Sequence, residues 1–378
     1  MRIDARHDHS LRIPRPDLSA TLGTPNACGN CHAKQGAQWA ADAIKSWTGK
    51  APAGFQTYGP ALRAGDVGAP GARGALLTVI DDSNAPAIAR ASAIDRLGQM
   101  LSPSTLPAVT LALNDPDSVV RLAAVEAIGG ADPATRVRYL PRVLNDPVKA
   151  VRIEAARSLA GPAEGGIPAL DRGSFQNALD EYIAVQAYNA DRPESHMNLG
   201  NLYVARGDAA KATAELRDAL ALDPTSTAAR VNLADIYRAQ RNDTEGETVL
   251  REGLAKAPRD AALHHALGLA LVRQKRSADA LRELGEATKV DPTNPRYAYV
   301  YAVALNDSGK KDEALRVLAA ALKTHPYDRD VLFGLAHFSA AAGQRDAAVG
   351  YAKTLAELDP ENPEYARLAA SLAAGPAR

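Results

Sequence analysis

A proline recurs every 34 residues in the second half of the chain, and this period constrains the fold more than any other feature. The prolines are Pro224, Pro258, Pro292, Pro326 and Pro360. Small residues keep the same phase at Ala212, Gly246, Ala280, Ala314 and Ala348. Small side chains let two helices approach closely, and a proline ends a helical hairpin. Because such hairpins bury their apolar faces only by stacking, the period predicts an α-solenoid.

A pair of residues early in each unit completes this pattern. The pairs are Leu199-Gly200, Leu233-Ala234, Leu267-Gly268, Tyr301-Ala302 and Leu335-Ala336. The pattern resembles the tetratricopeptide repeat over five units, with a leading half-unit at residues 175–190. The resemblance implies that the first helix of each unit lines a groove for a protein or peptide, unless the groove only packs against another domain. The implied groove residues are Asn201, Val204, Asp235, Arg238, His265, Leu269, Arg296, Tyr299, Asn306, Phe333 and His337.

A second period, of 31 residues, precedes the first. It is marked by Arg90, Arg121 and Arg152. Before the last two arginines, we expect Asp115 and Asp146 to cap helices that begin at Pro116 and Pro147. The pattern resembles the shorter HEAT-like repeats, which implies stacked hairpins. We expect the arginines to bond adjacent loops rather than bind a ligand.

The two cysteines of the chain lie in the run Cys28-Gly29-Asn30-Cys31-His32. Thiols at this spacing can form thioethers to one porphyrin, and His32 can then bind the iron as the proximal axial ligand. A thioredoxin-like pair would need a surrounding βαβ pattern, and a zinc site would need two more ligands at a recognised spacing. A simple disulfide is the third alternative. The run predicts one covalently bound haem c.

The sixth iron ligand is expected to be a histidine. Met1 is the only methionine in the first fifty residues, so a local His/Met pair is not expected. His9 is the candidate distal ligand and His7 a weaker candidate, unless these histidines only hydrogen-bond the loop. The histidines of the second half, such as His264 and His325, are expected to be groove or core residues.

The segment after the cysteines is predicted to be a short helix over residues 38–47. Trp39, Ala43 and Trp47 form one apolar stripe on it, and we expect both tryptophans to pack against the haem edge or the helix core. Residues 51–72 are rich in glycine, alanine and proline and are predicted to be a linker.

The N-terminal region also resembles a known junction. It contains Asp8-His9-Ser10, Pro14-Arg15-Pro16-Asp17 and Gly23-Thr24-Pro25-Asn26-Ala27-Cys28. The whole chain thereby resembles the C-terminal part of multihaem c-type cytochromes that carry HEAT-like and tetratricopeptide repeats. The resemblance implies a haem ligand at His9, and further haem sites and a signal peptide before the first residue, so that the chain begins at an internal methionine. It implies a redox partner, or the missing multihaem domain, as a partner.

The sequence therefore predicts an all-α chain in four parts. They are a c-type haem-binding segment at 1–50, the linker at 51–72, HEAT-like repeats at 73–165 and tetratricopeptide repeats at 171–378. The chain holds 44 basic and 44 acidic side chains, and this balance argues against a broad nucleic-acid or membrane-surface footprint. It has no run of 18 apolar residues, so no membrane span is expected.

The predicted function is electron transfer by a periplasmic or otherwise exported haem protein whose repeats dock partners. The sequence shows no nucleophile–base pair, phosphate-cradling loop or paired carboxylates, so an enzyme is not expected. Two alternatives remain open. The chain is a fragment of a multihaem oxidoreductase that reduces a small oxyanion, or it is a haem-free interaction scaffold.

Overall fold

The computed structural model describes residues 14–51, 54 and 56–374, and the all-α prediction is confirmed over them. These residues form α-helices and two short 3-10 helices and contain no strand. None of the helices in this part of the chain has the length and apolar character to cross a bilayer. The predicted ligands His7 and His9 lie outside the described residues.

Four helices precede the repeats. They are α1 (Pro16–Leu22), α2 (Cys28–Cys31), α3 (Gly36–Thr48) and α4 (Gly59–Val67). Helix α1 packs on α3 and on α4, and so ties the cysteine segment to the start of the solenoid.

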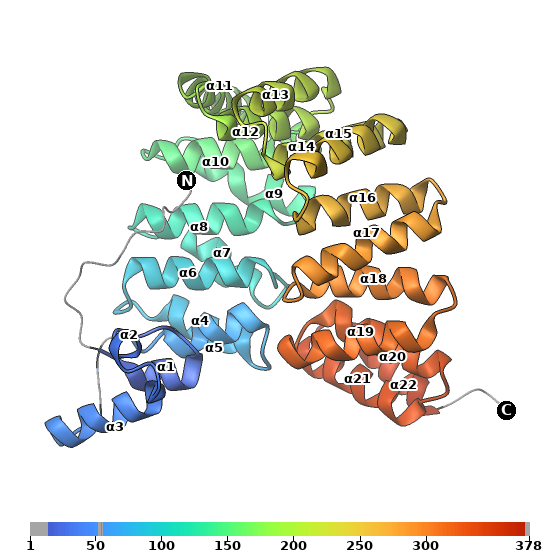
Figure 1. The fold of residues 1–378 in the computed structure, drawn as a ribbon. Coiled ribbons are helices and arrows are strands. Elements are labelled where there is room, and N and C mark those ends of the chain that lie inside the picture. The colour runs from blue at the N-terminus through green and yellow to red at the C-terminus, as the bar shows by residue number, and fades with distance from the viewer. Residues whose placement is uncertain (1–13, 52–53, 55, 375–378) are drawn as a thin grey trace.

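The HEAT-like hairpins follow and stack in one column (Figure 1). They comprise α5 (Ala72–Asp81), α6 (Ala87–Gly98), α7 (Leu106–Ala112), α8 (Ser118–Gly129), α9 (Pro133–Tyr139), η1 (Leu140–Val143), α10 (Lys149–Leu159) and η2 (Glu164–Gly166).

The 34-residue units form a second column. Its helices are α11 (Arg172–Tyr188), α12 (Pro193–Ala205), α13 (Ala209–Leu222), α14 (Thr227–Ala239), α15 (Asp243–Lys256), α16 (Ala261–Arg273), α17 (Ser277–Val290), α18 (Pro295–Asp307), α19 (Lys311–Thr324), α20 (Arg329–Ala341), α21 (Arg345–Leu358) and α22 (Pro363–Ala374). The small residues in phase with the prolines sit in the hairpin contacts, where Ala212, Ala314 and Ala348 are fully buried.

The core of the first column continues into the start of the second. A single cluster of buried side chains runs from Ala72 in α5 to Leu202 in α12. At the junction, Gly161 has a left-handed backbone (φ +83°) and lies against the Ala205 carbonyl at the end of α12. The junction therefore fixes how the second column leaves the first.

The arginine row forms a ladder along the first column, as predicted. Arg121 donates two hydrogen bonds to Asp146, with Nε–Oδ2 at 2.7 Å and Nη2–Oδ1 at 3.0 Å. Arg90 donates to both carboxylate oxygens of Asp115 through Nη2. Arg152 bonds Glu181 of α11, which carries the ladder across the junction into the second column.

The predicted helix starts at Pro116 and Pro147 are wrong. Helix α8 is capped by Asp117, whose side chain accepts from the Val119 N–H, and α10 begins at Lys149. Asp115 and Asp146 accept from the backbone two residues ahead and from the ladder arginines. Their carboxylates hold the loop rather than the helix end.

The predicted linker also differs from the structure, because residues 59–67 form α4. Pro60 stands in its first turn and Gly68 ends it with a left-handed backbone. Ala61 and Leu62 pack against the core of the first column. The composition that suggested a linker places its proline and glycine at the helix ends, where both residues favour helix boundaries.

The second column turns back until its last hairpins lie beside the first HEAT-like helices (Figure 1). We call this contact the seam; it joins residues 63–104 to residues 295–361. Arg73 Nη1 donates to Asp359 Oδ1 at 2.9 Å and lies 3.6 Å from Glu361 Oε1. The hydroxyls of Ser104 and Ser102 also donate to Glu361. The solenoid is thereby closed on itself.

Reversing the charge of Arg73 is expected to open the seam. In Arg73→Glu, a carboxylate faces Asp359 and Glu361, so attraction becomes repulsion across the contact. Small-angle X-ray scattering should then report a larger radius of gyration, and high salt should move the wild type in the same direction.

The matched control is Arg251→Glu on α15, whose partner Glu247 lies on the same helix. This variant should scatter like the wild type. Combining Arg73→Glu with Asp359→Arg and Glu361→Arg should restore the compact curve. A compact Arg73→Glu variant would show that these charges do not hold the ends together.

Candidate functional site

The first candidate site is a pocket of about 500 Å³ between the first helices of two consecutive hairpins. Helices α12 and α14 form it. We call it the groove pocket. Its lining residues are Asn201, Val204, Gly207, Ala209, Asn232, Asp235, Ile236, Arg238, Ala239 and Gln240. The structure therefore brings together four of the predicted groove residues, Asn201, Val204, Asp235 and Arg238.

Polar side chains of the groove pocket are held in place by one another. Asn232 Nδ2 donates to Asn201 Oδ1 at 2.9 Å, across the two helices. Arg238 Nε donates to Asp235 Oδ1 at 2.9 Å on α14, and both side chains are about half exposed. Sequence reasoning missed Asn232, although it lies three residues before Asp235 and hence on the same helix face.

The other predicted groove residues lie further along the second column. The His265 ring lies tilted against Tyr297 with ring centroids 4.8 Å apart, and the Phe333 ring lies tilted against His337 at 4.3 Å. Arg296 lies 3.5 Å from Asp330. Tyr299 packs into the core of its hairpin, while Leu269 and Asn306 are half-buried. These residues form separate pairs rather than one pocket.

His265 differs from the other predicted groove residues in its buried ring nitrogen. Its Nδ1 is buried without a hydrogen-bond partner among the described residues. Burial lowers the pKa of His265 to about 4, and the nearby positive charge of Arg296 adds to this effect. The ring is therefore neutral at pH 7 and contributes an apolar face to the groove.

The second candidate site is the segment from Cys28 to Trp47. Asn26 Oδ1 accepts from the Gly29 N–H at 3.1 Å, and the His32 N–H donates to the Cys28 carbonyl at 2.8 Å. These bonds wind the two cysteines into the single turn of α2. Cys28 is half-buried, Cys31 and His32 are exposed, and the two thiols are not joined in a disulfide.

Both tryptophans of α3 lie at the surface. Trp47 is 77% exposed and Trp39 is 37% exposed, while Ala40 and Ala41 form the buried face of the helix. The prediction that the tryptophans pack in the helix core is wrong for the described part of the chain. The His32 ring lies against Trp39, with centroids 4.7 Å apart. The thiols, the imidazole and an uncovered indole therefore lie close together.

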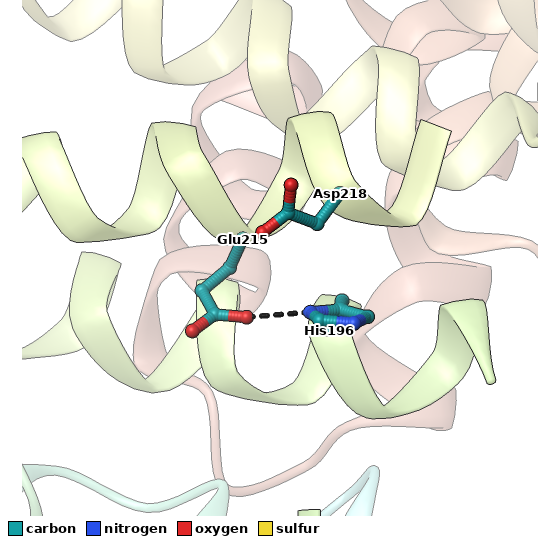
Figure 2. Close-up of side chains that lie close together, drawn as sticks. All are labelled: His196, Glu215 and Asp218. Carbon is teal, nitrogen blue, oxygen red and sulfur yellow. Dashed lines mark hydrogen bonds and ion pairs between the residues drawn. The ribbon is translucent and has the colours of Figure 1, made fainter. Parts of the chain in front are cut away.

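A third cluster joins α12 and α13. Figure 2 shows the Glu215 carboxylate facing the His196 ring, with Asp218 beside them. One ligand atom from each residue lies within 4.8 Å of the others, a spacing that suits a metal ion. However, His196 Nδ1 is 2.7 Å from Glu215, and Nε2 is 3.0 Å from the Ala190 carbonyl. Both nitrogens already lie within hydrogen-bonding distance of acceptors, so neither points into an open metal position.

The same arrangement recurs two periods later, which identifies it as a repeat element. His264 Nδ1 lies 2.8 Å from Glu283, and its Nε2 lies 3.0 Å from the Pro258 carbonyl. In both places the histidine ties the second helix of a hairpin to the loop before the first. The sequence interpretation of His264 as an ordinary structural residue fits this geometry.

The His196 contacts predict a pH-dependent stability. Burial lowers the pKa of His196, but the hydrogen bonds to Glu215 and Ala190 outweigh it, so the pKa is raised overall. The stabilisation is fully present below the unfolded-state pKa of about 6.5 and is lost as pH rises through the folded-state pKa. We expect a loss of less than about 1 kcal/mol, because solvent screens this pair.

Urea unfolding followed by circular dichroism between pH 5.5 and pH 8.5 measures this effect. The variants His196→Gln and Glu215→Gln should both flatten the pH dependence, since each removes one partner. A His196→Gln curve parallel to that of the wild type would contradict the assignment.

The fold defines the class of protein: a helical repeat protein with two successive arrays. Models of the tetratricopeptide repeat match residues 152–327 and 305–372, and a model of HEAT repeats matches residues 106–170. The tetratricopeptide matches together extend over more than half of the chain. The chain therefore carries tetratricopeptide repeats and HEAT repeats.

Several solved structures are similar to parts of this chain. A crystal structure of MamA is 19% identical, covers 44% of this chain and 97% of that chain, and has a TM-score of 0.38. YrrB, described as a TPR protein with an unusual peptide-binding site, is 20% identical over 49% and 96%, with a TM-score of 0.37. PilF of Pseudomonas aeruginosa is 20% identical over 58% and 98%, with a TM-score of 0.42. No curated protein matches the chain.

Proposed function

We propose that the tetratricopeptide array is a docking scaffold that binds an extended segment of a partner protein in the groove pocket. The observation that supports this proposal most directly is the pairing of Asn201 with Asn232 across two first helices. Each amide keeps donor and acceptor capacity beyond that bond, which suits the backbone of an extended peptide. Val204, which is 48% exposed, supplies an apolar contact beside the amides.

A peptide selected by phage display on the immobilised chain tests this proposal. The charge-reversing variant Asp235→Arg should weaken its binding at least tenfold, because Asp235 lies in the pocket and is more than half exposed. Asp312→Arg is the matched control, since Asp312 is exposed on a second helix, α19. Equal binding by both variants would place the docking surface elsewhere.

A second candidate function is covalent binding of haem c at the N-terminal segment. The observation that favours it is the surface that α2 and α3 leave uncovered. Cys31, His32 and Trp47 are all exposed, the His32 ring lies against Trp39, and exposed aromatic side chains are typical of a surface that something covers. The His32 ring forms no hydrogen bond with any described residue, so its nitrogens are available as ligands.

The residues present fit the group in this site. Cys28 and Cys31 would hold it through thioethers, His32 would bind its iron, and the indoles of Trp39 and Trp47 would shield one edge from water. Bound there, the haem would supply one-electron transfer. The single turn of α2 carries both cysteines, and His32 directly follows it. Attachment of haem c would also require export from the cytoplasm.

Haem staining of a denaturing gel tests this candidate. The chain is expressed with an export signal in a host that attaches haem c, and the wild type should retain haem after denaturation. The double variant Cys28→Ala with Cys31→Ala should lose all staining, whereas Trp47→Leu should keep it. An unstained but well-folded wild type would leave the haem-free scaffold as the function of this chain.

A further inference from the structure

The seam encloses a cleft of about 1030 Å³ that belongs neither to the groove pocket nor to the cysteine segment. We call it the seam cleft. One wall is α4 with the end of the α6 hairpin at Met100, and the other is the turn from α19 into α20. Its two walls lie next to each other because the ends of the solenoid meet at the seam.

Three basic side chains line the seam cleft from both walls. Arg63 comes from α4, Lys323 from the last turn of α19, and Arg329 from the first turn of α20. None of the three forms a hydrogen bond or an ion pair with another residue in the described part of the chain. This contrasts with the ladder arginines, which all have carboxylate partners.

The three carboxylates of the same cleft are already engaged. Asp66 accepts from Arg96 at 2.7 Å, and Asp328 caps α20 by accepting from the Val331 N–H at 2.8 Å. Asp330 lies 3.5 Å from Arg296. Asp66 and Asp330 thus face arginines and Asp328 holds the start of α20, whereas the three bases have no carboxylate partner and are available to the carboxylates of a ligand.

The walls between these charges are partly apolar. Val67 and Tyr327 are half-buried in the cleft, Met100 is 9% exposed, and Pro326 stands beside them. A cleft with separate cations and apolar patches suits a chain that alternates carboxylates with apolar side chains. It suits a nucleic acid less well, since there is no continuous basic stripe and the net charge of the chain is zero.

We propose that the seam cleft binds an acidic, extended segment of a partner protein. Its carboxylates pair with Arg63 on one wall and with Lys323 and Arg329 on the other. The bound segment thereby bridges the first and the last repeats of the closed solenoid. This surface is separate from the groove pocket, so the inference does not depend on peptide binding there.

Fluorescence anisotropy of a labelled hexapeptide of alternating glutamate and leucine tests the proposal on the full chain. The wild type should bind it, and the triple variant Arg63→Gln, Lys323→Gln and Arg329→Gln should bind at least tenfold more weakly. The matched control is Arg192→Gln, Lys256→Gln and Arg259→Gln, which removes three exposed charges outside the cleft and should bind within twofold of the wild type.

Three further tests make a negative result decisive. Circular dichroism and scattering should show that the triple variant is folded and closed; the variant Arg63→Lys with Arg329→Lys keeps the charges and should keep the affinity. Tripolyphosphate should compete at least tenfold more weakly than unlabelled peptide, because it cannot use the apolar walls. Absence of binding to the wild type, equal loss in the control variant, or equal competition by tripolyphosphate would each overturn the proposal.

Discussion

Replacing Gly161 with alanine is expected to lower the free energy of unfolding by about 2–5 kcal/mol. The backbone at Gly161 is left-handed (φ +83°), where a side chain is strained. A Cβ there would also lie 2.1 Å from the Ala205 carbonyl oxygen, a backbone atom at the end of α12. The junction between the two columns must move to accept it. Chemical denaturation followed by circular dichroism measures the loss.

Gly207 provides the control for this prediction. Its φ is +77°, but an added Cβ would meet nothing within 4 Å. Gly207→Ala should therefore show only the conformational part of the effect, about 1 kcal/mol. If the two variants unfolded at the same denaturant concentration, the close approach of Gly161 to α12 would have no energetic weight.

Replacing Asp146 with alanine is expected to cost about 2–3 kcal/mol. The Asp146 carboxylate is 6% exposed and the Arg121 side chain 13% exposed, so the variant leaves a largely buried guanidinium without its partner. The Val148 N–H, which donates to Asp146 at 2.8 Å, also loses its acceptor. Denaturant unfolding measures the loss. Glu364→Ala, which breaks an exposed pair with Arg367, should change stability by less than about 0.5 kcal/mol.

The Asp146 carboxylate also makes the free energy of unfolding depend on pH in the acid range. Burial raises the pKa of Asp146, but the hydrogen bonds from Arg121 and Val148 outweigh it, so the pKa is lowered overall. The stabilisation is present above the unfolded-state pKa of about 3.9 and is lost as pH falls through the folded-state pKa. Asp146→Ala should lose this part of the acid dependence, and an unchanged acid dependence would contradict the role of the ladder.

The repeats could be predicted from the sequence because their contacts are local. Small residues such as Ala212 and Ala348 meet partners within the same or the next hairpin, and a fixed period marks such positions. The ladder was predictable for the same reason, since Arg121 bonds a loop only 25 residues further on. Helix starts were less predictable, because both Asp115 and Asp117 are suitable helix caps. Asp115 is held by the loop and by Arg90, so Asp117 caps the helix instead.

The seam could not be predicted from any pattern. Arg73 and Asp359 are 286 residues apart, and whether they meet depends on small rotations that accumulate from one hairpin to the next. No single residue carries that information. The groove pocket stands between these cases: its face was predictable from helix spacing, but the contact between Asn201 and Asn232 depends on how two hairpins stack. Whether the tryptophans of α3 are covered also depends on more than local spacing.

The ends of a typical solenoid are free to move, whereas the seam joins the two ends of this one. In an open array, a hairpin that changes its tilt simply moves the free end. Here Arg73 and Glu361 join the end of the second column to the start of the first. A change of tilt in one hairpin must therefore be compensated in other hairpins or must open the seam. A partner that alters the stacking of α12 on α14 therefore does mechanical work on a contact at the opposite end of the column. Whether the seam is open or closed therefore depends on what is bound elsewhere along the solenoid.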